Sequence, residues 1–434
     1  MREMKDSRIE WIGEIPKGWK LQKGRYLFQQ RNEKGNRNCL QLLSPSQQYG
    51  VIPQKLLEEL TTQKAVKLKD GTDLNLLKTV HKGDFCISLR SFQGGFEYST
   101  YEGVVSPAYQ IFYKNSNIVD NYYRFMFKDA SFTKKMNSYT MSLRDGKNIA
   151  YFDFGNSYLP VPPYKEQQQI ADFLDSKCSE IDDITADIQK EITVLEDYKK
   201  SVITEAVTKG LNPNVEMKNS GIEWIGKIPK HWKLTRLKYL LKERMKYGAT
   251  ESGVSYSNQL PRYIRITDIS LDGKLKKENM LSLPEAIAKN YLLTDKTILF
   301  ARSGATVGKT FLYHENNGRA AFAGYLISAY CDIAKCIPEF LYFYTKSAAY
   351  DSWVNLIFEQ ATIQNISADK YQDLIIPITN TMEQQKIINL LDSKCSEIDA
   401  TIADKQKQLE VLADYKKSLI YEYVTGKKEV PCHE

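Results

Sequence analysis

The chain contains the same pair of sequence blocks twice. Residues 166–208 and 383–425 both begin with Glu-Gln-Gln, continue into DSKCSEID and then reach DYKKS, with identical spacing between the three markers. A second repeat precedes each half, because IEWIGEIPKGWKL at 9–21 corresponds to IEWIGKIPKHWKL at 222–234. Between these repeats the two halves differ in sequence. Any account of the fold must therefore explain a repeated frame that carries two divergent inserts.

Length and composition are those of a globular protein with two or three domains. The 434 residues are 42% hydrophobic and 26% charged, which is ordinary for such a chain. No apolar run reaches the ~18–20 residues of a membrane span, and the polar start MREMKDSRIE has no signal-peptide core. The seven cysteines are scattered, which does not indicate a disulfide framework, so we expect a reducing, cytoplasmic location. We expect no metal site, because cysteine and histidine pairs at complete ligand spacing are missing.

The charge is divided unevenly along the chain. Residues 165–210 carry 6 Lys against 11 acidic residues, and residues 382–434 carry 8 Lys against 10, whereas the whole chain has a net charge of +7. The basic excess therefore lies in the divergent inserts. This favours a polyanionic partner such as DNA, although a lysine-rich surface that only maintains solubility would give the same balance.

The two acidic repeats predict long helices. Apolar residues recur at spacings of three and four, and no Pro or Gly intervenes before Gly210 and Gly426, which are natural helix stops. Each helix should contain roughly 45 residues and extend about 65–70 Å. An apolar seam of this length needs a partner helix, and antiparallel pairing of the two copies would place the inserts at opposite ends. The residues predicted to pair the helices are Leu174, Ile181, Ile188, Leu195, Tyr198, Leu391, Ile398, Leu412 and Tyr415.

The inserts, residues 22–163 and 235–381, predict two α+β units with a common plan. In each, an alternating strand ends in Arg-Ser beside a glycine-rich loop, and a second strand, aromatic helical stretches and an apolar strand follow. These segments are 84–90, 108–113, 122–136 and the strand into Pro160 in the first insert, and 296–302, 324–329, 338–356 and the strand into Pro377 in the second.

An arginine in a loop after a rigid strand is well placed for bidentate contact with guanine or phosphate. The alternative is an arginine that caps carbonyl groups at the strand end. The duplication of the Arg-Ser pair favours the functional interpretation. The candidate DNA-binding residues are Arg90, Ser91, Gln93, Tyr109, Arg144, Lys147, Arg302, Ser303, Thr306, Lys309, Arg319, Tyr325, Gln364 and Asn365.

Two sequences approach catalytic motifs without matching them. The segment 304–310, GATVGKT, resembles a phosphate-binding P-loop but has three residues between its glycines where the motif needs four. Lys309 and Thr306 are better interpreted as contacts to DNA phosphates or bases. The segment 161–164, VPPY, lacks the first-position amide of the NPPY motif of amino-methyltransferases. We therefore expect no active site in this chain.

Together these features resemble the specificity subunit of type I restriction-modification systems, over essentially the whole chain. The motifs that carry the resemblance are the paired EQQxI starts, the LDxKxxEID helices and the IEWIGxIPxxW leaders. SLRSFQGG with VSPAY, and ARSGATVGK with Tyr325, resemble the two common styles of target-recognition domain.

The resemblance implies an α+β protein in which two α/β target-recognition domains are joined by two long antiparallel coiled-coil helices, as a pseudo-two-fold internal repeat. The expected divisions are 1–163 (first target-recognition domain with its leader), 164–210 (first helix), 211–381 (second domain with its leader) and 382–434 (second helix and tail).

The resemblance also implies how the work is divided among subunits. Each target-recognition domain reads one half of a bipartite site on double-stranded DNA, and the helices set the spacer and dock two methyltransferase subunits. S-adenosylmethionine, ATP and Mg²⁺ belong to partner subunits, including the restriction and translocation subunits of the full complex, and this chain binds no cofactor. A coiled-coil scaffold that joins two protein-binding modules is the alternative, although it would leave the basic inserts unexplained.

Overall fold

The computed structural model describes residues 2–35, 41–61, 76–87, 95–139, 149–270, 273–304, 306–359 and 365–431. The chain divides into two compact units: unit 1 comprises residues 1–188 and 406–434, and unit 2 comprises residues 189–405. Because these boundaries fall inside the long helices, each unit contains part of both. The boundaries expected from the sequence, after residues 163, 210 and 381, instead follow the helix ends.

The two long helices are present where the sequence predicts them. Helix α6 spans Tyr164–Lys209 and helix α11 spans Thr381–Val424. Gly210 and Gly426 follow their ends with φ angles of 72° and 71°. This left-handed conformation is accessible to glycine without a side-chain clash, so the predicted stop signals are confirmed.

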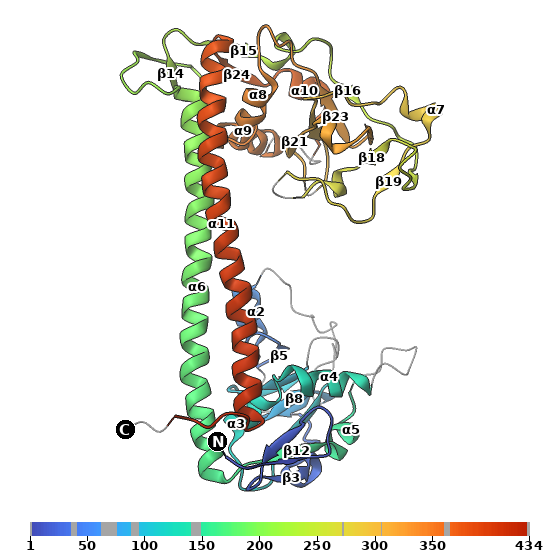
Figure 1. The fold of residues 1–434 in the computed structure, drawn as a ribbon, viewed down its shortest axis with the longest axis vertical. Coiled ribbons are helices and arrows are strands. Elements are labelled where there is room, and N and C mark those ends of the chain that lie inside the picture. Colours follow the sequence, from blue (N-terminus) through green and yellow to red (C-terminus); the bar gives the residue numbers. More distant parts are fainter. Residues whose placement is uncertain are drawn as a thin grey trace. The chain divides into compact units, whose positions relative to one another are not determined.

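Within each unit, the first part of one long helix packs against the last part of the other, which is an antiparallel arrangement (Figure 1). Two equivalent ion pairs join them: Lys416 Nζ lies 2.6 Å from Asp182 Oδ1 in unit 1, and Lys199 Nζ lies 2.6 Å from Asp399 Oδ1 in unit 2. The duplicated DSKCSEID and DYKKS blocks therefore contact each other between helices, each supplying one partner of these pairs.

Most of the predicted pairing residues lie on the packed face. Five of them are buried, and Leu195 and Leu412 are half-buried. The five are Leu174, Ile181, Ile188, Leu391 and Ile398.

Tyr198 and Tyr415 do not belong to the packed seam, and this part of the prediction is wrong. Both side chains are 54% exposed. The line of seven-residue steps through Leu174, Ile181 and Ile188 to half-buried Leu195 stays on the packed face. Tyr198 instead lies two heptads after Ile184, which is itself 48% exposed, so this second line faces away from the seam.

The elements of unit 1 besides the long helices are short. Its strands are β1 (Met4–Asp6), β2 (Glu14–Pro16), β3 (Lys20–Lys23), β4 (Phe28–Arg31), β5 (Leu43–Ser46), β6 (Gly50–Pro53), β7 (Lys78–Val80), β8 (Phe85–Ile87), β9 (Phe96–Tyr98), β10 (Gly103–Val105), β11 (Gln110–Lys114) and β12 (Tyr158–Val161). Its helices are α1 (Gly24–Leu27), α2 (Gln54–Leu60), α3 (Asp120–Met126), α4 (Ala130–Ser138) and α5 (Tyr151–Asn156).

Unit 2 is built from a similar set. Its strands are β13 (Met217–Asn219), β14 (Lys227–Pro229), β15 (Lys233–Arg236), β16 (Lys246–Tyr247), β17 (Val254–Ser255), β18 (Arg262–Ile264), β19 (Leu281–Ser282), β20 (Ile298–Ala301), β21 (Thr310–Leu312), β22 (Ala320–Phe322), β23 (Leu326–Ala329) and β24 (Ile375–Ile378). Its α-helices are α7 (Glu285–Ala288), α8 (Pro338–Tyr344), α9 (Ala348–Glu359) and α10 (Ala368–Gln372), with 3-10 turns η3 (Leu237–Tyr239), η4 (Ile266–Asp268) and η5 (Glu315–Asn317).

The two inserts share a sheet topology despite their different sequences. Unit 1 has a four-stranded antiparallel sheet in the order β4-β11-β8-β9, and unit 2 has one in the order β16-β23-β20-β21. The leader hairpins β1–β2 and β13–β14 also correspond, as do the pairs β3–β12 and β15–β24. The predicted common plan is thus confirmed for the strand order, whereas the Arg-Ser end of the strand in the first insert lies outside the described residues. Unit 2 adds a sheet in the order β17-β19-β18-β22, in which β18 and β22 are parallel.

Aromatic side chains dominate both cores. In unit 1 the rings of Phe85 and Phe112 stack with centroids 5.3 Å apart, and the sheet packs against the aromatic side chains of the helices. In unit 2 Phe300 of β20 packs against Tyr371 of α10, with ring centroids 4.9 Å apart. Offset and edge contacts of this kind stabilise a core beyond the apolar area that they bury, so each four-stranded sheet is a rigid support for the loops at its strand ends.

Candidate nucleic-acid interface

The end of β20 holds Arg302 by its backbone on both sides. The Arg302 amide donates to the carbonyl of Tyr325 at 3.0 Å, and the Ile366 amide donates to the carbonyl of Arg302 at 2.8 Å. Ser303 and Asn365 form an antiparallel bridge. The start of the loop therefore extends the sheet, as the sequence predicts for an arginine after a rigid strand.

The Arg302 guanidinium lies against an aromatic ring rather than a carboxylate. Its Cζ is 4.8 Å from the ring centroid of Tyr247, and its Nε lies 3.5 Å from Asn365 Oδ1. In the part of the chain that the structure describes, Arg302 forms no ion pair with an acidic side chain. The charge of this half-buried arginine is thus available for an external acceptor.

The loop that follows Arg302 is closed by its own hydrogen bonds. The amide of Val307 donates to Gly304 at 3.1 Å, that of Gly308 to Ala301 at 3.0 Å, and that of Lys309 to Thr306 at 3.0 Å. These amides are occupied by carbonyl groups, so the loop does not direct them at a phosphate as a P-loop does. Its charge comes from the Lys309 side chain.

Arg319 and Tyr325 lie at either end of the strand–turn segment that includes β22. Arg319 Nη1 donates to Glu285 Oε2 at 2.9 Å and Nη2 to the other carboxylate oxygen, and this hydrogen bonding lowers the pKa of Glu285. Arg319 is therefore already neutralised by a bidentate partner. The Tyr325 side chain is exposed directly across the strand pair from Arg302.

In unit 1, Tyr109 occupies the place that Tyr325 has in unit 2, immediately before the equivalent strand. Tyr109 is half-buried beside a small core, and its carbonyl accepts a hydrogen bond from Lys78 Nζ at 2.7 Å. The other candidate residues of this insert lie outside the described residues, as does one from the second insert. They are Arg90, Ser91, Gln93, Arg144, Lys147 and Gln364.

An additional arginine in unit 1 has a structural role. Arg31 of β4 donates to both carboxylate oxygens of buried Asp84, at 2.7 and 3.0 Å. Burial alone would lower the pKa of Arg31, but the hydrogen bonds and charge of Asp84 outweigh it and raise the pKa. These hydrogen bonds fix β4 to the neighbouring turn.

The first residue of each duplicated EQQ motif joins the leader to a long helix. Trp19 Nε1 donates to Glu166 Oε2 at 2.9 Å in unit 1, and Trp232 Nε1 donates to Glu383 Oε1 at 3.1 Å in unit 2. Sequence reasoning did not assign these contacts. The signal was present, since leader tryptophan and helix glutamate both occur in each repeat.

The second residue of the motif joins the insert to the same helix. Gln167 accepts from the Val119 amide at 2.9 Å, and Gln384 accepts from the Ile337 amide at 2.8 Å. Both glutamines are buried. Val119 and Ile337 directly precede α3 and α8, so the repeated motif fixes the same part of each insert.

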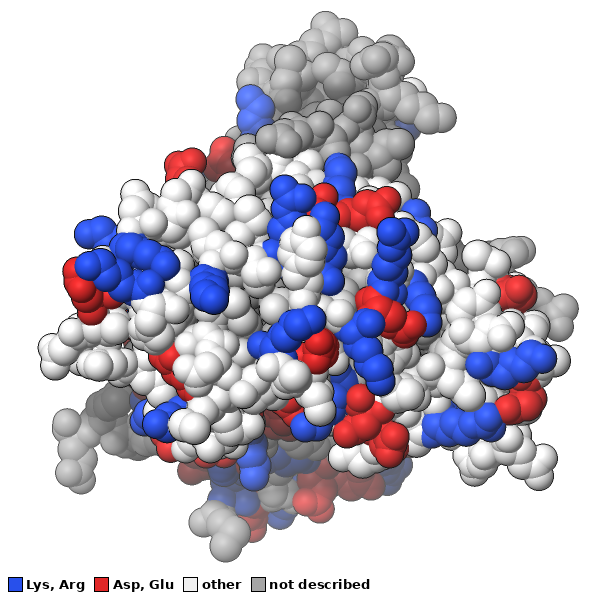
Figure 2. Space-filling model, turned by 90° about the horizontal axis from the view of Figure 1, so that it is seen from above, with Lys and Arg blue, Asp and Glu red and all other residues white. Residues whose placement is uncertain are grey.

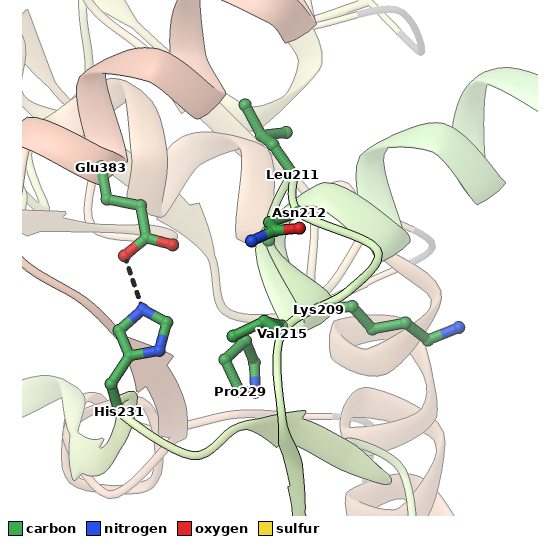
Figure 3. Close-up of a pocket in the computed structure, with 8 residues that line it drawn as sticks. Lys209, Leu211, Asn212, Val215, Pro229, His231 and Glu383 are labelled. Carbon is green, nitrogen blue, oxygen red and sulfur yellow. Dashed lines mark hydrogen bonds and ion pairs between the residues drawn. The ribbon is translucent and has the colours of Figure 1, made fainter.

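A pocket of about 220 Å³ lies beside the end of α6 in unit 2 (Figure 3). Its wall includes the turn after Lys209 and the imidazole of His231, whose Nε2 lies 2.9 Å from Glu383 Oε2. Burial alone would raise the pKa of Glu383, but hydrogen bonds from Thr379, His231 and Trp232 outweigh it and lower the pKa. The polar groups of this pocket thus join helix and leader.

The described surface carries charges of both signs. Figure 2 shows one face on which Lys and Arg side chains are interspersed with Asp and Glu. Paired charges such as Arg236 and Lys238 with Asp373 contribute to this pattern in unit 2. Net charge alone therefore does not locate the interface, and cations without a carboxylate partner are more informative.

Among the described residues, no helix is long and apolar enough to cross a membrane.

The chain contains two units with the same sheet order, and each includes part of both long helices. In unit 2 an arginine without a carboxylate partner among the described residues lies at a strand end. These features are those of a binding protein with two recognition units. Residues 1–194 and 229–411 match the family described as the type I restriction modification DNA specificity domain. The chain therefore belongs to this family, and its role is DNA recognition as a specificity subunit of a type I restriction-modification system.

The similar proteins agree with this assignment. Over 392 residues the chain is 24% identical to the type I restriction enzyme MjaVIII specificity subunit of Methanocaldococcus jannaschii, a match that covers 84% of both chains. It is 23% identical over 260 residues to the EcoBI specificity subunit of Escherichia coli, covering 57% of this chain and 53% of the relative. A solved chain from work on complex assembly and conformational transition of the type I R-M system has a TM-score of 0.69 at 13% identity, with 95% of this chain and 99% of the other covered. At 13% identity, this similarity shows that the two chains share a fold.

Proposed function

We propose that each insert reads one half of a bipartite site on double-stranded DNA. The observation that carries this proposal is the repetition of one sheet order, β4-β11-β8-β9 and β16-β23-β20-β21, in two inserts of different sequence. A common scaffold with divergent loops is suited to reading two different sequences by the same geometry. The scaffold alternative accounts for the paired helices but not for the available cations of the second insert.

In the second half-site, Arg302 is the residue we propose to contact a base edge. A lost bidentate contact costs about 1–3 kcal/mol of discrimination, so Arg302→Ala should relax one position of that half-site. Arg319→Ala is the matched control, because Glu285 already occupies its guanidinium. Equal discrimination by wild type and Arg302→Ala in competition binding would contradict the assignment.

Lys309 has a different proposed role, as a contact to the DNA backbone. It has no ion-pair partner among the described residues and lies on the loop after Arg302. Lys309→Ala should weaken binding to all sequences equally and reduce the slope of affinity against salt by about one phosphate contact. A change of sequence preference in this variant would instead indicate base contact.

We further propose that the long helices dock two methyltransferase subunits. Val194 and Tyr198 on α6 are 59% and 54% exposed, and the equivalent Val411 and Tyr415 on α11 are 60% and 54% exposed. Side chains four residues apart share a helix face, so each helix presents the same apolar pair. Two equivalent apolar pairs fit two copies of one partner.

This docking proposal predicts stoichiometry. Asp at both Val194 and Tyr198 should remove one methyltransferase copy, and the same change at Val411 and Tyr415 should remove the other, measured as complex mass by light scattering. Ile184→Asp is the matched control, because Ile184 is 48% exposed on α6 and has no apolar counterpart in the repeat. Unchanged mass in both paired variants would contradict the proposal.

The same division of labour assigns the chemistry to partner subunits. S-adenosylmethionine-dependent adenine methylation, and ATP- and Mg²⁺-dependent translocation and cleavage, would be carried by the methyltransferase and restriction subunits in the cytoplasm. A gel shift with and without methyltransferase subunits on DNA fragments of the genome tests this account against the scaffold. Sequence-specific retardation supports DNA recognition, and binding of protein partners without DNA supports the scaffold.

A further inference from the structure

We propose that Tyr247 is a positioning residue for Arg302 and thereby determines how sharply the second half-site is read. This inference rests on the proposed function of Arg302 as a base-reading residue. Tyr247 lies outside the loop motif that contains Arg302 and is separated from it by 55 positions in the sequence. The fold brings the two together.

The strand register places Tyr247 and Arg302 on one face of the sheet. Tyr247 of β16 is paired with Ile327 of β23, and Ile327 is paired with Phe300 of β20. Directly paired residues share a face of a sheet, and residues two apart along a strand return to that face. Arg302 follows Phe300 by two residues, and the 4.8 Å separation between its Cζ and the Tyr247 ring centroid fits this placement.

The Tyr247 ring is itself held in place. Its hydroxyl oxygen accepts a hydrogen bond from the Ala368 amide at 3.0 Å, which attaches it to the start of α10. The side chain remains 41% exposed, so the arginine that it supports lies at the surface. A flexible arginine loses conformational entropy when it binds. A fixed aromatic ring restricts Arg302 in the unbound protein, so less entropy is lost when DNA binds.

Arginines that are held by a bidentate carboxylate show how Arg302 differs. Arg31, Arg265 and Arg319 are oriented by carboxylates, which also neutralise their charge. Tyr247 orients Arg302 through a cation–π contact and Asn365 through one weak contact to Nε. Neither neighbour neutralises the charge, and no hydrogen bond to another described residue occupies the terminal guanidinium nitrogens. These nitrogens can therefore contact a bidentate acceptor such as guanine.

The test uses the complete complex of this chain with its methyltransferase subunits. Binding competition measures discrimination between the cognate DNA and a DNA altered at the second half-site position that Arg302→Ala relaxes. An exposed cation–π contact corresponds to about a two- to fivefold effect, so Tyr247→Leu should lose discrimination by that factor. Tyr247→Phe retains the ring but loses the hydrogen bond from the Ala368 amide, so its discrimination should lie between those of wild type and Tyr247→Leu. Tyr239→Leu is the matched control, since Tyr239 makes a comparable contact with Lys238, at 5.5 Å.

The outcomes separate this proposal from the proposed function. If the wild-type complex recognises no bipartite sequence, the proposed function fails. If wild type discriminates but Tyr247→Leu does so equally well, the positioning role is overturned and DNA recognition stands. In an Arg302→Ala background Tyr247→Leu should have no further effect on discrimination. A further loss there, or a loss at both half-sites, would show that Tyr247 acts other than through Arg302.

Discussion

Replacing Gln384 by alanine should destabilise the unit 2 insert locally, where it packs against α11. The buried side chain of Gln384 accepts from the Ile337 amide at 2.8 Å and donates to the carbonyls of Thr379 and Lys335 at 2.7 and 3.0 Å. Alanine leaves the Ile337 amide without this acceptor, and a buried donor that loses its partner costs about 1–3 kcal/mol. Gln385→Ala, one residue further on, should cost little, because the exposed Gln385 side chain bonds to Asn389 on the helix surface.

Hydrogen exchange followed by mass spectrometry measures this change in each unit separately. A loss of 1–3 kcal/mol corresponds to about 5- to 150-fold faster exchange in peptides that cover α8, while α3 of unit 1 serves as the internal reference. Gln167→Ala should produce the mirror result, with α3 affected and α8 unchanged. Equal exchange in Gln384→Ala and Gln385→Ala would refute the argument that the buried glutamine fixes the insert.

Two other predictions concern the second leader and the long helices. The pKa of Glu383 is lowered by bonds from Thr379, His231 and Trp232 against the opposing effect of burial. The Glu383 carboxylate therefore stabilises unit 2 above the unfolded carboxyl pKa of about 4.3. This stabilisation is lost as pH falls through the lower pKa of the folded state. In acid titrations followed by fluorescence, Glu383→Gln should reduce the dependence of unit 2 stability on pH. Inserting four helix-forming residues near Asp187 should lengthen α6 by ~6 Å and widen the spacer in methylated motifs by about one or two base pairs, and an active variant with the original spacer would show that the helix does not set it.

Features governed by local periodicity were predictable from the sequence. The uninterrupted three-and-four spacing gave both long helices, and Gly210 and Gly426 marked their ends. Tyr198 and Tyr415 fit the three-and-four spacing as well as the buried residues do, yet both are 54% exposed. Periodicity marks an apolar face of the helix, but the packing of the partner helix decides which residues of that face are covered.

Contacts between distant segments were not predictable in the same way. Arg302 was identified from its place after a strand, but its neighbour Tyr247 depends on the pairing of β16, β23 and β20. Arg319 looked equally suitable, and the carboxylate of Glu285 that occupies it is contributed by a separate helix. Net charge and local pattern cannot distinguish an arginine that is available to DNA from one that is paired with a carboxylate. The carboxylate comes from a distant part of the sequence, and only the tertiary fold brings it close.

The two inserts should read the two halves of one DNA site independently of each other. Sequencing of methylated adenines, in cells whose specificity subunit has residues 22–163 replaced by the equivalent insert of another family member, tests it most directly. The repeated frame and the second insert are unchanged in this variant. One half of the methylated motif should change while the other half and the spacer remain. A motif in which both halves change, or neither does, would contradict it.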